Sequence, residues 1–169
     1  MDKYGMVMAL CGVVSAALLS GIGSAIGIFV ASRAATGVLS EKPERYGQMF
    51  IMVVLPGTQG FYGFLAAFIV MLKLNFFGTV GTGGVPDVSL ALGLRILTAC
   101  LPVAFAGLIT AIYQGKVSAC GIMMAGKRPE LAFKAGVVYA VMVEIYAILG
   151  LLTTMFMLLK GIPWPGQAV

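Results

Sequence analysis

The sequence predicts an all-α membrane protein with four transmembrane helices arranged as two tandem helical hairpins. Hydrophobic residues make up 60% of the 169 residues, charged residues make up only 10%, and the mean hydropathy is +1.04. A soluble domain of this size could not bury so much apolar surface. The charges also cluster so that four long apolar segments remain, and the chain repeats itself with a period of 86 residues.

The four apolar segments cover residues 4–32, 46–72, 96–115 and 135–159. Each has about the 20 residues that a helix needs to cross the hydrocarbon layer, which predicts four helices with both termini on one side. The first segment is longer than the core of a signal peptide and has no clear cleavage site, so we expect a retained helix. Residues 75–88 are rich in glycine and are expected to form a flexible external loop.

The distribution of positive charge predicts the orientation in the membrane. The links between helices one and two and between helices three and four carry seven lysines and arginines, against four at the opposite helix ends. Positive residues favour the cytoplasmic side, so both links are predicted to be cytoplasmic and both termini external, in a multi-pass protein of the cell membrane. The net charge of +5 is therefore a topology signal, and nothing indicates nucleic-acid binding.

The repeat relates two hairpins of the same orientation. An offset of 86 positions places residues 21–26 on residues 107–112 without a gap. The halves are residues 1–80 and residues 81–169, and only the second carries an acid in a membrane segment. Because one period spans a whole hairpin, this is a parallel duplication, unlike the inverted repeats that build many transporters.

Small residues recur every four positions on helices one and three. They are Gly23, Gly27, Ala31 and Ala35 on helix one, and Gly107, Ala111, Gly115 and Ala119 on helix three. Such faces let helix backbones approach closely, so we expect helices one and three to line the inner wall of an oligomer, with the bulkier helices two and four outside. The faces could instead pack the helices of one monomer. A second small series on helix one, formed by Ala16, Ser20 and Ser24, favours the oligomer.

Glu144 is the only acidic residue in the last apolar segment. An ionised acid at the centre of a membrane costs roughly 2.5–3.5 kcal/mol, so it usually marks an ion path or a proton relay. The alternative is a structural glutamate, permanently protonated or paired with a buried base. No lysine or arginine lies near its depth in the sequence, and the equivalent position in the first half is Thr58.

Two glutamines are predicted to lie at the depth of this acid. Gln59 follows the turn residue Pro43 by 16 positions. At the second turn, Glu144 follows Pro129 by 15 positions and Gln114 precedes Pro129 by 15 positions. At a rise of about 1.5 Å per residue, all three lie about 22–24 Å from their turns. The three side chains can therefore meet.

The oxygen atoms of this layer suit a hard cation such as sodium. Helix two places Leu55, Thr58, Gln59 and Tyr62 on one face, at i, i+3, i+4 and i+7. A carboxylate, a hydroxyl and two amide carbonyls are oxygen ligands, and Pro56 disturbs the helical bonding so that a backbone carbonyl can join them. A proton carrier needs only the carboxylate, and the other groups would then hydrogen-bond a protonated acid and one another. The residues alone therefore leave both Na⁺ and H⁺ as candidates for the transported ion.

These features closely resemble the rotor-ring proteolipid of bacterial V-type (V/A-type) rotary ATPases, in particular the sodium-translocating kind. The resemblance rests on the duplicated hairpin, the segment 55–63, Gln114 and Glu144, and it covers the whole chain. It implies a homo-oligomeric ring that carries Na⁺, with H⁺ as the alternative. The implied ligands are the carbonyl of Leu55 and the side chains of Thr58, Gln59, Gln114 and Glu144, with Tyr62 hydrogen-bonded to Glu144 to hold it closed.

The resemblance also implies partners. These are identical subunits, the lipid bilayer, a stator membrane subunit that supplies an arginine, and central-stalk subunits on the loops around residues 41–45 and 126–130. The sequence has no phosphate loop, so the chemistry of ATP is expected in other subunits. A small four-helix multidrug exporter would need neither the tandem repeat nor two glutamines at the depth of the acid. A structural pore or junction protein would leave the single buried acid unexplained.

Overall fold

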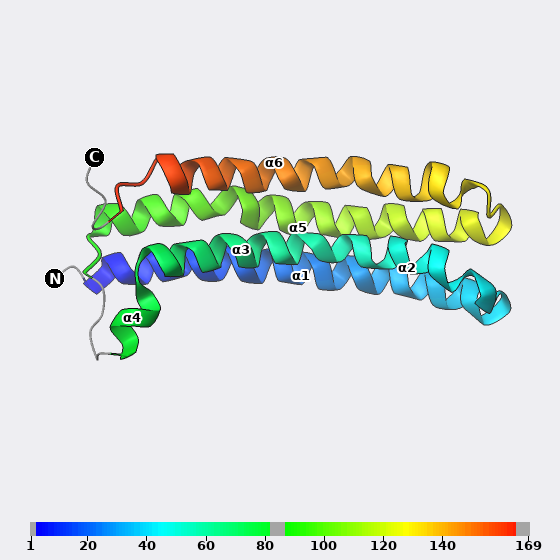
Figure 1. Ribbon diagram of the computed structural model, residues 1–169, viewed down its shortest axis with the longest axis horizontal. Coiled ribbons are helices and arrows are strands. Elements are labelled where there is room, and N and C mark those ends of the chain that lie inside the picture. The colour runs from blue at the N-terminus through cyan, green and yellow to red at the C-terminus, as the bar shows by residue number, and fades with distance from the viewer. Residues whose placement is uncertain (1–2, 82–86, 165–169) are drawn as a thin grey trace.

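The computed structural model describes residues 3–81 and 87–164, and this part of the chain is almost entirely helical (Figure 1). The helices are α1 (Lys3–Glu41), α2 (Tyr46–Val54), α3 (Thr58–Lys73), α4 (Phe76–Gly81), α5 (Leu90–Lys127) and α6 (Val138–Lys160). Shorter segments are the 3₁₀ turns Pro43–Arg45 and Leu55–Gly57 and the π-helical segment Ala132–Val137. Within the described residues, four helical stretches are long and apolar enough to cross a membrane, as predicted.

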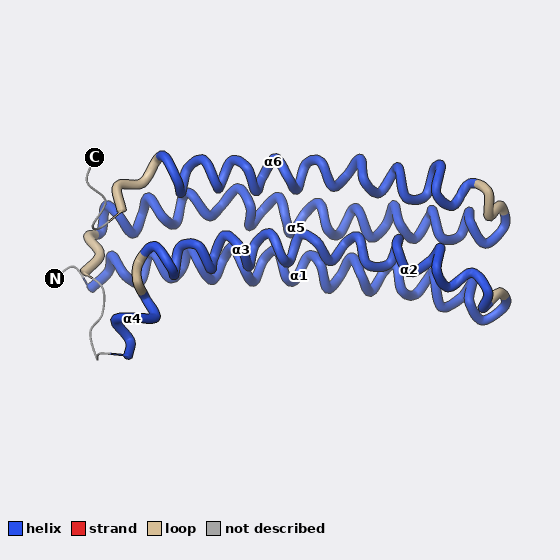
Figure 2. The backbone as a smooth tube through the Cα atoms, in the orientation of Figure 1, coloured by secondary structure: helices blue, strands red, loops and turns tan. Residues whose placement is uncertain are grey.

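The long helices form two hairpins that lie side by side. One hairpin consists of α1 with α2 and α3, the other of α5 with α6, and the two tight turns lie at the end opposite the chain termini (Figure 2). The contact between α1 and α5 is by far the most extensive, whereas α3 and α6 touch little. Helices suit this apolar chain because a spanning segment must satisfy its backbone hydrogen bonds internally.

The second membrane crossing is interrupted at Pro56, where the sequence predicts disturbed bonding. Proline has no backbone N–H and cannot continue the pattern of an α-helix. The chain here forms a 3₁₀ turn in which the backbone N–H of Thr58 donates to the carbonyl of Leu55. This turn separates α2 from α3 and fixes the first residues of α3.

One expectation about the links between the helices needs correction. The helices themselves continue past the charge-free segments, so that α1 reaches Glu41 and α5 reaches Lys127, because charged residues can continue a helix beyond an apolar layer. The link expected to be a flexible loop is helical in part, since α4 covers Phe76–Gly81. Residues 82–86 of this link lie outside the described residues.

The small-residue faces of α1 and α5 pack against each other within one chain. A Cβ atom added to Gly115 would collide with the carbonyl oxygen of Gly27, and one added to Gly23 would lie 2.6 Å from the carbonyl oxygen of Leu108. The backbones are thus in direct contact, as small residues permit. These faces hold the two hairpins of a monomer together, which is the alternative that the sequence left open.

The second small series on α1 is also used inside the chain. Ala16 and Ser20 are fully buried, and the Ser20 hydroxyl donates to the carbonyl of Val103 at 3.0 Å. The Ser24 hydroxyl accepts a hydrogen bond of 2.8 Å from the backbone N–H of Gly60. Helix α1 therefore has close neighbours on two sides, as the series suggests, but both neighbours belong to the same chain.

The turn of the first hairpin holds the end of α5. Lys42 Nζ donates to the carbonyl of Gly126 at 2.6 Å, and the Arg45 guanidinium donates to the carbonyl of Ala125. The last carbonyls of a helix lack partners within it and attract positive charge, so these two side chains cap α5.

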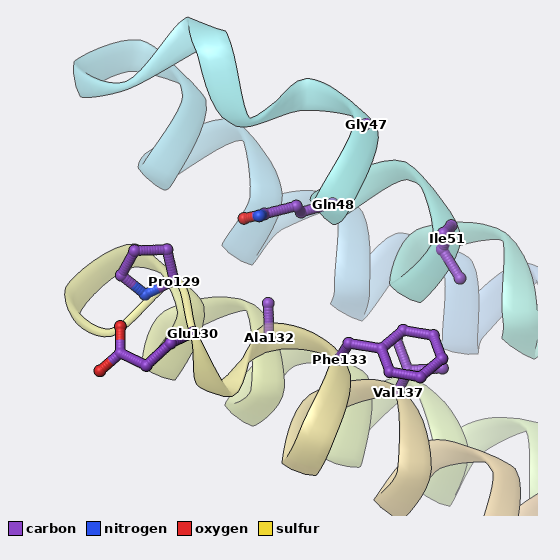
Figure 3. Close-up of a pocket in the computed structure, with 8 residues that line it drawn as sticks. All are labelled: Gly47, Gln48, Ile51, Pro129, Glu130, Ala132, Phe133 and Val137. Carbon is purple, nitrogen blue, oxygen red and sulfur yellow. The ribbon is translucent and has the colours of Figure 1, made fainter.

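A shallow groove lies between the two turns. It has a volume of about 170 Å³, and side chains from α2 and from the segment after the second turn line it (Figure 3). Gln48 and Ile51 contribute from α2, and Pro129 and Phe133 contribute from the other hairpin. The two turns thus form one continuous surface at this end of the molecule.

Candidate ion-binding site

Glu144 lies in the second turn of α6 and faces α3 and α5. Its side chain is 7% exposed. Among the described residues, no lysine or arginine forms an ion pair with it, since the ion pairs found there lie at the two turns. The carboxylate is therefore buried without a compensating positive charge from this chain, and hydrogen bonds must stabilise it.

Four side chains from two other helices converge on this carboxylate. The Thr58 hydroxyl lies 2.8 Å from Oε1 and 2.9 Å from Oε2, and the Tyr62 hydroxyl donates to Oε1 at 2.6 Å. The side-chain amides of Gln59 and Gln114 donate to Oε2 at 3.1 and 2.8 Å. Hydrogen bonds to an ionised acceptor are roughly twice as strong as neutral ones, so this arrangement suits a carboxylate that carries its negative charge.

Further hydrogen bonds orient the ligating side chains. The two glutamines are fully buried, and the Gln59 amide nitrogen donates to Oε1 of Gln114 at 2.7 Å. Gln114 also donates to the carbonyl of Ala140 at 3.0 Å. The Thr58 hydroxyl lies 2.9 Å from the carbonyl oxygen of Leu55, so this carbonyl faces the site.

The local sequence explains how these groups reach one point. The turn that contains Pro56 ends at Thr58, and residues three and four positions apart on α3 then share one face. On α5, Gln114 lies between Ala111 and Gly115 in the sequence, and the small size of these two residues brings α1 and α5 close together. Gln114 therefore lies at the junction of the two hairpins.

The structure brings together all six residues that the sequence singled out. It adds the carbonyl of Ala140, which lies one turn before Glu144 on the same face of α6. Sequence reasoning missed this group because, unlike the carbonyl of Leu55, it has no adjacent proline that marks it. The spacing of four positions from Glu144 was the only available signal. Together the groups form a cluster of oxygen atoms that can hold a proton or a hard monovalent cation.

A multi-pass membrane protein with one buried carboxylate at the contact of two helical hairpins belongs to the class of ion-carrying membrane subunits. The chain matches the family model of the ATP synthase C subunit over residues 11–70 and 97–157. It belongs to that family, whose members form homo-oligomeric rings in ATPases. The predicted resemblance to a rotor-ring proteolipid is thereby confirmed, and this chain is an ion-translocating ring subunit.

Two relatives carry related descriptions. The V-type sodium ATPase subunit K of Enterococcus hirae is 43% identical over 157 residues, which cover 93% of this chain and 94% of the relative. The A-type ATP synthase subunit K of Methanocaldococcus jannaschii is 31% identical over 153 residues, which cover 90% of this chain and 62% of the relative. The similarity thus extends over nearly the whole chain.

Proposed function

We propose that the Glu144 cluster binds Na⁺ and that the ring carries this ion across the membrane as it rotates. The observation that supports this most strongly is the convergence of Thr58, Gln59 and Gln114 on one buried carboxylate. The similarity to a protein named as part of a sodium ATPase supports the same cargo.

Binding of Na⁺ requires the two glutamine amides to turn. Their nitrogen atoms face the carboxylate, and half a turn about the last side-chain torsion would present the oxygen atoms to an ion instead. The proposed ligands are then both glutamine oxygens, the Thr58 hydroxyl, the Leu55 carbonyl and Glu144. A bound cation neutralises the carboxylate, so that a loaded site can face lipid whereas an empty one cannot.

Protons are the second candidate cargo. A protonated glutamate would accept fewer hydrogen bonds, yet four side-chain donors lie around Glu144. Buried donors without acceptors are unfavourable, so a site for protons alone would gain nothing from two additional amides. Each of these amides also carries an oxygen atom that a metal ion can use once the amide has turned, so the two glutamines favour Na⁺ over a proton.

The proposed mechanism needs partners outside this chain. A stator protein in the membrane would supply an arginine that draws Glu144 open and releases the ion, and other subunits would hydrolyse or synthesise ATP. Central-stalk subunits would bind the turns around residues 41–45 and 126–130, with these turns cytoplasmic and the termini external. The groove between the turns offers such a partner an apolar contact (Figure 3). Each copy would contribute the two hairpin repeats 1–80 and 81–169.

Labelling with a hydrophobic carbodiimide tests the cargo, because this reagent attacks a protonated acid. Added Na⁺ should slow the labelling of Glu144 at fixed pH, and more Na⁺ should be needed as pH falls, since proton and metal compete for one carboxylate. Potassium at equal ionic strength is the matched control and should protect far less. If Na⁺ gave no protection at any pH, the sodium proposal would be wrong and the proton carrier would replace it.

A further inference from the structure

The internal repeat provides a template for the contact between neighbouring copies. Within one chain, the hairpin of α1 and α3 packs against the hairpin of α5 and α6. In a closed ring the outer face of the second hairpin must meet the outer face of the first hairpin of the next copy. The two hairpins are equivalent through an offset of 86 residues. If residue i of the first hairpin contacts residue j of the second hairpin within the chain, residue i+86 of one copy should therefore contact residue j−86 of the next copy.

One close backbone contact of α1 with α5 maps to a pair of aromatic residues. Gly27 and Gly115 meet backbone to backbone within the chain. The repeat equivalent of Gly27 is Tyr113, and that of Gly115 is Phe29. Both aromatic side chains lie on the surface of the monomer, 57% and 60% exposed. We propose that Tyr113 of one copy packs against Phe29 of the next copy and so fixes the register between neighbouring subunits.

A second contact supports the same register. Gly23 packs on the backbone of Leu108 within the chain, and the equivalent pair is Ile109 with Ile22. These two isoleucines are also exposed in the monomer. An exposed apolar face is expected on lipid or on another copy, and here its positions coincide with those of an established helix contact.

The mapped interface differs from its template in the size of its side chains. Glycines allow α1 and α5 of one chain to touch, whereas an aromatic pair and an isoleucine pair hold two helices further apart, since the separation of helix axes depends on the side chains between them. The helices of the inner wall should therefore alternate between close and wide spacing. Arg33 and Lys116 lie over the rings of Phe29 and Tyr113, at 5.7 and 4.9 Å from the ring centres.

The same mapping predicts which residues meet between neighbouring copies at the depth of the ion. Within the chain Gln59 donates to Gln114, and the equivalent pair is Ile145 of one copy with Ile28 of the next. The polar layer therefore has an apolar counterpart between subunits, and no second ion site forms there. This inference rests on ring assembly and not on the identity of the ion.

Cross-linking of paired cysteines tests the register. In a variant whose Cys11, Cys100 and Cys120 are replaced by alanine, Phe29→Cys combined with Tyr113→Cys should be linked between copies, by oxidation or by a short bifunctional thiol reagent that spans the wider spacing, because the repeat places these two positions opposite each other. Denaturing mass spectrometry should then show dimers, trimers and larger species. The matched control is Phe29→Cys with Phe105→Cys, which lies on the same exposed face of α5 but eight residues, or about 12 Å, away. It should remain monomeric.

A second pair of cysteine substitutions serves as a check in case the first variant fails to assemble. Ile22→Cys with Ile109→Cys probes the same register through another contact and should give the same series of species. Native mass spectrometry of each variant reports whether the ring is intact. If neither pair produced cross-linked copies, or if the control cross-linked equally well, the proposed register would be wrong. That result would leave the sodium proposal untouched, because protection from carbodiimide does not depend on this interface.

Discussion

The two hairpins share one architecture and differ at the depth of Glu144. Counting through the repeat, the pairs of first-half and second-half residues are Thr58 and Glu144, Ile28 and Gln114, Gln59 and Ile145, and Tyr62 and Ile148. Neither hairpin holds a complete site, because α3 supplies three groups and α5 and α6 supply the others. The comparison shows that the site is a property of the contact between the hairpins.

Duplication makes this asymmetry possible. In a ring of unduplicated hairpins every contact between hairpins is the same, so a change at one contact changes all of them. A fused pair has two kinds of contact, one inside the chain and one between chains. In the proposed ring, the contact inside the chain keeps the polar groups and the contact between chains is apolar, so that the described residues of each copy contribute one buried acid for four membrane helices.

The largest effect is expected from removing the acid that distinguishes the second hairpin. Glu144→Gln keeps the size of the side chain, but it removes the charge that attracts an ion and replaces one accepting oxygen with an amide nitrogen that donates. Ion-coupled ATPase activity and carbodiimide labelling should fall to background, whereas native mass spectrometry should still show the ring. The control Asp87→Asn changes an exposed acid just before α5, away from the two turns, and should retain both properties. Coupled transport in the Glu144 variant would contradict the assignment.

The next largest effect concerns the glycines that hold the two hairpins together. Gly27→Leu or Gly115→Leu forces a side chain into the backbone of the facing helix, where nothing flexible can yield. Overpacking of this kind costs roughly 1–3 kcal/mol and more when backbones must separate. Loss of the folded subunit, and therefore of the ring, should be visible in native mass spectrometry. Gly37→Leu is the matched control, because a Cβ atom there meets nothing within 4 Å.

Much of this fold and site could be predicted from the sequence, because the strongest constraints are local. Apolar length sets the four helices, and equal distances from the turns place Gln59, Gln114 and Glu144 at one depth. Spacing on a helix face then adds Thr58 and Tyr62, which the structure brings to the same carboxylate.

The side of each helix that meets a given neighbour could not be predicted. A stripe of small residues shows that a backbone comes close but not whether it belongs to the same chain or to another copy. The sequence therefore leaves the partner of Gly27 open between another copy and its own chain, and the structure shows that α5 of its own chain contacts it. The roles of Lys42 and Arg45 are hidden for a similar reason. Their acceptors are backbone carbonyls of a distant helix, which residue types do not reveal.

A smaller effect should follow from removing one oxygen ligand at a time. Gln114→Leu or Thr58→Val deletes one buried polar partner of a charged group, which costs ~1–3 kcal/mol or roughly a five- to hundred-fold loss of affinity. The Na⁺ concentration needed for protection from carbodiimide should rise by that factor, while labelling itself continues. Ile28→Leu, at the first-half position equivalent to Gln114, is the matched control and should leave protection unchanged. If the required Na⁺ concentration rose equally in the variants and in the control, these positions of the two hairpins would not differ in ion binding, and the assigned ligands would be wrong.

The smallest effect is expected at Tyr62, whose second-half equivalent is Ile148. Its hydroxyl donates to Glu144 at 2.6 Å but is not among the proposed ligands, so it fixes the carboxylate without contacting the ion. Tyr62→Phe removes one hydrogen bond and leaves the ring in place, which costs about 1 kcal/mol, or roughly five-fold in apparent Na⁺ affinity. Because the hydroxyl holds the carboxylate in place, bound Na⁺ should also exchange faster in this variant. Isotope exchange from isolated rings measures that rate, with Tyr146→Phe, an exposed tyrosine on α6, as the control. Exchange as slow as in the unmodified ring would show that the glutamines and Thr58 hold the carboxylate without Tyr62.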